Sequence, residues 1–104
     1  MSDLKIELPH EALATFCRRH GIVRLEVFGS VLRDDFGPAS DIDFLVTWEP
    51  GSQPSLFTQF GMAEEMSRIV GRKVDFIPRE EIETSPNRFR RAAILGSSRV
   101  VFAA

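Results

Sequence analysis

Apolar and polar residues alternate along two segments of the chain, and a period of two predicts β-strands. Residues 22–28 read IVRLEVF, and residues 41–48 read DIDFLVTW. About a dozen residues separate the two segments, a length that suits an antiparallel pair. A third apolar run, residues 72–78, predicts another strand that ends at Pro78, because proline cannot continue the hydrogen-bond ladder.

Helical signals occur before and between these strands. Residues 10–20 combine apolar positions at helical spacing, basic residues in the last turn and Gly21 as a terminator. A second helix is predicted from a capping Ser55 to Val70. Its apolar side chains are expected on the inner side of the helix, namely Leu56, Phe60, Ala63, Ile69 and Val70.

Shorter elements complete the pattern. Residues 30–36 allow a short helical turn. Ser85 as a cap, with Pro86 at the first helical position, predicts a last helix through Ile94, and residues 98–102 predict a short edge strand. Together these elements predict an α/β (α+β) fold, in which helices cover a small mixed or antiparallel sheet.

Composition narrows the class of protein. The chain has 104 residues, 43% hydrophobic and 27% charged, so we expect one globular domain over residues 1–104. A net charge of -2 argues against direct nucleic-acid binding, which normally needs a basic face. No apolar run approaches the roughly 20 residues of a membrane span, so no membrane association is expected. The single cysteine, Cys17, excludes an intramolecular disulfide and favours a cytoplasmic location.

Two acids on one face of a predicted strand are the main candidate chemistry. Asp41 and Asp43 have alpha carbons about 7 Å apart at the usual rise of ~3.3 Å per residue. Like charges at this distance need a cation, and all-oxygen ligands favour Mg²⁺ or Mn²⁺. Asp75 is a third acid, within an apolar strand where an unused charge is costly. If its strand neighbours that of Asp43, three carboxylates share one cleft, which suits phosphoryl or nucleotidyl transfer with two metal ions.

A glycine and a serine precede the two acids at a fixed distance. Gly29 ends the first predicted strand, where the absence of a side chain lets the backbone approach a phosphate. Ser30 and the amides that open the following helical turn can hold phosphate oxygens. Arg33, one turn further, can offset the phosphate charge.

The segment GSVLRDDFGPASDID, followed later by KVDFI, resembles the minimal nucleotidyltransferases of the DNA polymerase beta superfamily. The resemblance extends over nearly the whole chain and implies a polymerase-beta-like nucleotidyltransferase core. It implies that Gly29 and Ser30 bind the nucleotide phosphates and that Asp41 and Asp43 bind magnesium. Asp75 would be the third carboxylate and the base. Arg33 matches an arginine that is often found three residues beyond the motif serine.

The same resemblance implies a substrate and a partner. Minimal members of this kind are commonly antitoxins paired with a HEPN-domain ribonuclease toxin, and some transfer AMP from ATP to a tyrosine of that toxin. We therefore expect a magnesium-dependent nucleotidyltransferase, with ATP as substrate and a HEPN toxin as partner. Two other functions stay open. The chain could neutralise a toxin by occlusion, with a site that only binds nucleotide, or it could modify a small molecule or an RNA end.

Several residues have simpler interpretations as well. An isolated pair of acids beside a turn is usually just solvated, and Asp75 could pair with Arg72 or Lys73. The phenylalanines Phe57, Phe60 and Phe89 are expected in the core. Trp48 could stack on a base, although packing against the sheet is favoured.

Overall fold

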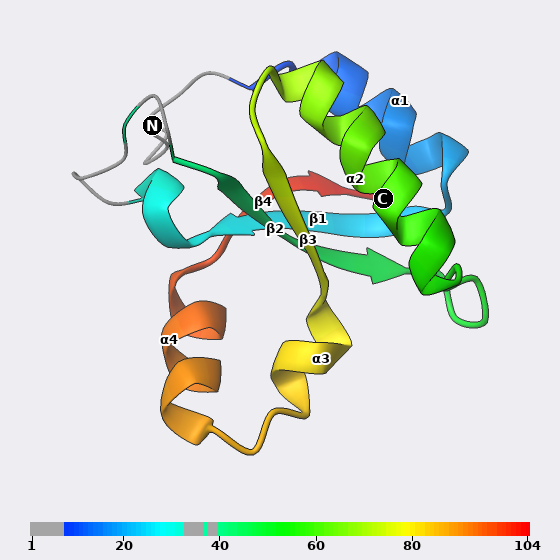
Figure 1. The fold of residues 1–104 in the computed structure, drawn as a ribbon. Coiled ribbons are helices and arrows are strands. Elements are labelled where there is room, and N and C mark those ends of the chain that lie inside the picture. The colour runs from blue at the N-terminus through cyan, green and yellow to red at the C-terminus, as the bar shows by residue number, and fades with distance from the viewer. Residues whose placement is uncertain (1–7, 33–36, 38–39) are drawn as a thin grey trace.

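Among the described residues, 8–32, 37 and 40–104, four strands form one mixed sheet in the computed structural model (Figure 1). The strand order is β3-β2-β1-β4, and the bounds are β1 Ile22–Phe28, β2 Ile42–Trp48, β3 Val74–Pro78 and β4 Arg99–Ala103. β1 pairs antiparallel with both β2 and β4, whereas β3 runs parallel to β2. This arrangement confirms the predicted antiparallel pair and the short strand at the end of the chain.

Helices lie on both faces of this sheet. α1 (His10–Arg19) and α2 (Leu56–Val70) cover one face, and α3 (Arg79–Glu83) and α4 (Arg88–Ser97) extend from the other (Figure 1). A short 3-10 helix, η1 (Gly29–Leu32), follows β1 directly. α2 connects β2 to β3, and such a helical crossover is what a parallel pair requires. None of the helices in the described ranges is both long and apolar enough to cross a membrane.

The main core lies between the sheet and the first two helices. Phe16 of α1, Phe44 of β2 and Met66 of α2 are buried there. Trp48 is 7% exposed and packs edge-on against Phe76, which confirms the packing interpretation of this residue. A smaller cluster on the opposite face joins Phe28, Leu45 and Ile82, with further contacts from the last helix.

The buried side of α2 differs from the prediction. Leu56 and Phe60 are each 72% exposed, and Phe57 is 87% exposed, so these residues are not in the core. The residues that α2 buries are Gln59, Met62 and Met66. Gln59 can occupy an interior position because its Nε2 donates a hydrogen bond to Pro54 O at 2.9 Å. The predicted ends were correct, since Ser55 accepts from Thr58 N and Gly71 has a left-handed φ of 75°.

The last part of the chain also differs in detail. α3 was not predicted, because five residues give too short a pattern. α4 begins at Arg88 rather than at Pro86, and Asn87 caps it by accepting a hydrogen bond from Arg90 N. Phe89 of this helix is 78% exposed, so the expectation that it lies in the core is wrong. α4 has no fully buried residue, and Phe89 contacts solvent within a first turn that is otherwise basic.

Candidate active site

Strand pairing places two of the three acids opposite each other, and the third lies just before the same strand. Asp41 directly precedes β2, and Asp43 is the second residue of that strand. In the parallel pairing of β2 with β3, Asp43 lies opposite Asp75. Neighbouring strands are about 4.8 Å apart, and paired residues point to the same face of a sheet. The strand of Asp75 therefore neighbours that of Asp43, as the three-carboxylate hypothesis requires.

The alternation along β2 separates these acids from the main core. Phe44 and Val46 are buried against α1 and α2, while Asp43 is half-buried on the opposite face. Asp41 is half-buried as well, and Asp75 is exposed. None of the three residues is fully buried by the described part of the chain, and Asp75 has the most exposed surface.

Gly29 lies against Asp43. Its neighbour Phe28 pairs with Asp43 across β1 and β2, and Gly29 itself has a left-handed φ of 78°. A Cβ atom at position 29 would lie 2.5 Å from Asp43 Oδ2, closer than real Cβ atoms approach. Only glycine therefore fits here for two independent reasons, the backbone conformation and the space occupied by the carboxylate.

The chain before Asp41 is held by the side chain of Arg72, which lies between the end of α2 and the start of β3. Arg72 Nη1 donates hydrogen bonds to Gly37 O at 2.8 Å and to Ser40 O at 3.1 Å. Ser40 Oγ in turn accepts from Gly37 N. Ile42 N then donates to Lys73 O at 3.0 Å, which starts the pairing of β2 with β3. These contacts fix the position of the backbone on both sides of Asp41 and the point at which β2 begins.

The structure describes one of the predicted phosphate-binding residues, Ser30, only in part, and another, Arg33, not at all. Ser30 lies in η1, immediately after Gly29, and the structure describes its backbone alone. Arg33 lies outside the described residues. The backbone order nonetheless agrees with the prediction, since a 3-10 turn begins at the glycine and follows the strand beside Asp43.

The donor atoms of this site fit a hard divalent cation, because carboxylate oxygens are the ligands that Mg²⁺ and Mn²⁺ prefer. Within the described ranges, however, no three acidic, histidine or cysteine side chains already converge on one point as a metal centre. The residues therefore fit a divalent cation by the type of ligand atom and by the pairing of Asp43 with Asp75. Asp75 is exposed, so its carboxylate is able to change rotamer.

A buried ion pair that sequence reasoning missed lies further along the same face. Glu26 of β1 is 2% exposed, although it occupies a polar position of the alternating segment 22–28. Its Oε1 accepts a hydrogen bond from Arg79 Nη1 at 2.5 Å, and its Oε2 accepts from Ser98 Oγ at 2.8 Å. Glu26 thereby joins β1 to the start of α3 and to the residue before β4. No local signal in the sequence distinguishes this glutamate from a solvated one.

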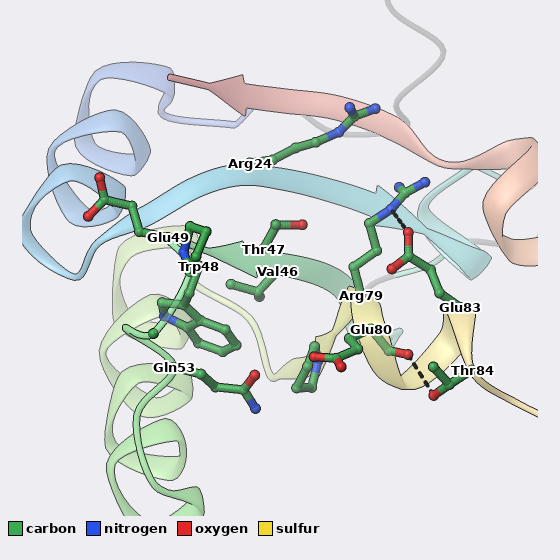
Figure 2. A pocket seen from close by; sticks show the side chains of 13 residues that line it. Arg24, Val46, Thr47, Trp48, Glu49, Gln53, Arg79, Glu80, Glu83 and Thr84 are labelled. Carbon is green, nitrogen blue, oxygen red and sulfur yellow. Dashed lines mark hydrogen bonds and ion pairs between the residues drawn. The ribbon is translucent and has the colours of Figure 1, made fainter.

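A larger cavity, of about 650 Å³, occupies the opposite end of β2 (Figure 2). Thr47, Trp48 and Arg79 line it, together with residues of the loop after β2 and of α3. None of Asp41, Asp43 and Asp75 is among its lining residues. Its lining includes the basic Arg24 and Arg79 and the acidic Glu49, Glu80 and Glu83, so the cavity has no uniform charge (Figure 2). The acids therefore define the candidate active site, and this cavity does not.

The sequence profile of the nucleotidyltransferase domain family matches residues 10–100 of the chain. The chain belongs to this nucleotidyltransferase family. The match includes Gly29, Asp41, Asp43 and Asp75, so the residues described above lie within the family domain.

Individual relatives agree with this assignment. A protein of Methanocaldococcus jannaschii that carries the name "putative protein adenylyltransferase" is 36% identical over 59 residues, which are 57% of this chain and 61% of that protein. The chain thus spans less than two thirds of the length of this relative. A solved structure described as a "putative minimal nucleotidyltransferase" is 32% identical, covers 86% of each chain and gives a TM-score of 0.65.

A more distant likeness concerns the fold. A solved complex of a tri-AMPylated Shewanella oneidensis HEPN toxin with an MNT antitoxin contains a chain that is 12% identical, with a TM-score of 0.62. The match covers 91% of this chain and 70% of the other. A likeness at 12% identity shows a shared fold, which here is the nucleotidyltransferase fold.

Proposed function

We propose that this nucleotidyltransferase moves AMP from ATP to a hydroxyl group of a partner protein, and that the partner is a HEPN-domain toxin. In this proposal, modification of the toxin is how the chain acts as an antitoxin. The observation that carries the proposal is the position of Asp43, which has Gly29 on one side and Asp75 on the other.

Gly29 and Ser30 are proposed to bind the phosphates of the nucleotide. The missing side chain at Gly29 leaves backbone amides of η1 accessible beside Asp43, and amides at a turn of this kind hold phosphate oxygens. Arg33 would add a positive charge to the same phosphates. This arrangement would orient the α-phosphate of ATP toward the face that carries the acids.

The acids would perform the transfer. The oxygen of the acceptor hydroxyl attacks the α-phosphorus of ATP, the bond between that phosphorus and the bridging oxygen of the β-phosphate breaks, and pyrophosphate leaves. Asp75 accepts the hydroxyl proton, for which its exposed carboxylate on β3 is suited. Asp41, Asp43 and Asp75 would hold two magnesium ions, with manganese as a substitute. When bound, these ions would neutralise the phosphate charge that develops in the transition state.

The choice of partner rests on two of the related proteins described above. The solved complex with an AMP-bearing HEPN toxin supports a protein acceptor and AMP as the transferred group. The name of the Methanocaldococcus relative also supports a protein acceptor. Transfer would take place after the acceptor protein covers the open face of the sheet.

The test uses ATP labelled either at the α-phosphate or at the γ-phosphate, magnesium, and a purified HEPN-domain toxin as the proposed partner. Label from the α-position alone should appear on the partner. An Asp75→Asn variant should slow this transfer by roughly 10²–10⁴-fold, the usual contribution of a general base. Transfer of γ-label would instead indicate a kinase. Silencing of the toxin with no label transferred would indicate inhibition by occlusion.

A further inference from the structure

The N-terminal half of α2 carries three large apolar side chains in contact with solvent. Leu56 and Phe60 are each 72% exposed, and Phe57 is 87% exposed. Single exposed apolar residues are common, but three on one half-helix form a patch of the kind that marks a binding surface. These three side chains do not contribute to the packing of α2 on the sheet, which is made by Met62 and Met66.

Two of these side chains line a groove that reaches the candidate active site. The groove has a volume of about 180 Å³, and we call it the α2–β3 groove; its lining residues are Leu56, Gln59, Phe60, Ala63, Val74, Asp75 and Phe76. Asp75 is the single charged residue among these. An apolar surface is therefore continuous with the carboxylate that we propose as the base.

β3 forms the floor of this groove and is an edge strand. Within the described ranges its one strand neighbour is β2 (Figure 1). Ile42 N donates to Lys73 O, so the backbone groups of Lys73 and Asp75 face β2. Those of Val74 and Phe76 then point away from the sheet, because the direction alternates along a strand. An extended segment of another protein can pair with such an edge over a few residues, up to Pro78.

Pairing at this edge determines which side chains of the added strand lie near Asp75 and which lie near α2. A side chain of the added strand that lies beside Asp75 is on the open face, together with Asp43. Its immediate neighbours in the added strand point to the opposite face, toward Leu56 and Phe60. The acceptor residue would thus carry apolar residues on one or both sides of it in sequence.

We propose that the α2–β3 groove binds an extended segment of the acceptor protein, in which the hydroxyl residue lies beside Asp75 and its apolar neighbours contact Leu56 and Phe60. The proposal rests on the proposed function, since it assigns an acceptor to the same site. Asp75 is the single charged group among the described lining residues, and its carboxylate would repel an acidic segment. An apolar segment with a neutral hydroxyl residue is not repelled. Continuity with Asp75 supports the acceptor over a second copy of the chain.

The test compares Phe60→Ala with Phe89→Ala. Both side chains are largely exposed, at 72% and 78%, but Phe89 lies on α4, away from the groove. Neither change should alter the unfolding midpoint. The acceptor probe is the same HEPN-domain toxin that serves in the test of the proposed function. Its dissociation constant is measured without nucleotide, and its KM and kcat are measured with ATP and magnesium. Phe60→Ala should raise the dissociation constant and KM by at least about tenfold with kcat nearly unchanged, whereas Phe89→Ala should leave all three unchanged.

The outcomes separate this inference from the proposed function. If the partner binds without transfer, and Phe60→Ala but not Phe89→Ala weakens binding, the proposal that the groove binds the partner is supported and the proposal of AMP transfer is overturned. If transfer occurs and the two variants behave alike, the groove is wrong and the transfer stands. A modified residue with charged neighbours on both sides would also overturn the groove. Loss of self-association in Phe60→Ala, measured by sedimentation velocity without partner, would assign the groove to a second copy instead. Neither binding nor transfer by the wild-type chain would overturn both proposals.

Discussion

Gly29 is the residue on which the spacing between β1 and the acids depends most directly. The Cβ atom of an alanine there would collide with Asp43 Oδ2, and the φ of 78° is costly for any side chain. Asp43 would have to move for the alanine to fit. A metal ligand that moves by about 1 Å can lower the rate of a reaction by roughly 10²-fold.

We therefore expect Gly29→Ala to reduce AMP transfer by about 10²-fold or more. The matched control is Gly51→Ala, because Gly51 also has a φ of 78° but its Cβ would meet nothing within 4 Å. Both variants should lose about 1–2 kcal/mol of unfolding free energy, the usual cost of a left-handed non-glycine residue. Rates of transfer and urea denaturation measure the two effects. Equal activity in both variants would contradict the proposed contact with Asp43.

Cys17 is a second residue whose environment gives a clear expectation. The side chain is fully buried in the main core, and this burial raises the pKa of the thiol to about 12 despite the nearby charge of Arg18. At pH 8 the thiolate population of the folded protein is therefore negligible. We expect iodoacetamide to alkylate Cys17 only after denaturation, as mass spectrometry can measure. Rapid alkylation of the native protein would show that this part of the core opens.

At the scale of elements, the ion pair of Glu26 connects α3 to the sheet. Arg79 reaches both Glu26, which is buried, and Glu83, which is half-exposed. The two contacts should differ in strength, because an unpaired charge in the interior is costly and an exposed pair on a helix contributes little.

We expect Arg79→Leu to lower the unfolding free energy by about 3 kcal/mol, because it leaves Glu26 buried without its main partner. Glu83→Ala, which removes the exposed partner of the same arginine, should cost less than about 1 kcal/mol. The double variant Glu26→Leu, Arg79→Leu should be more stable than Arg79→Leu alone. Urea denaturation measures all three. If the double variant is no more stable than Arg79→Leu alone, the prediction of a coupled pair is wrong.

Prediction from sequence worked best for elements with a strong local pattern. The alternation in residues 22–28 and 41–48 located two strands, and Gly21 and Gly71 ended the two long helices as expected. The inner side of α2 was predicted correctly at the end of the helix, where Ile69 and Val70 pack against the core, but not in its first half. There the interior position belongs to Gln59, whose hydrogen bond to Pro54 compensates burial, while Phe57 and Phe60 remain outside.

At the scale of the whole molecule, the sequence alone could not decide which strands are neighbours. The hypothesis of three grouped acids required β3 to lie beside β2, and tertiary pairing supplied this through the register of Asp43 with Asp75. Nothing local in the sequence specifies that register. The burial of Glu26 and the exposure of the α2–β3 groove are likewise properties of the assembled fold.

The measurement that tests the account most directly is the intact mass of the HEPN-domain partner after incubation with this chain, ATP and magnesium. A gain of one or more whole AMP units is expected, and chelation of the metal should abolish it. The variant Asp41→Asn, Asp43→Asn should give no gain while still binding the partner. An unchanged partner mass with the wild-type chain, while the complex forms and the toxin is silenced, would contradict transfer and indicate an antitoxin that acts by binding alone.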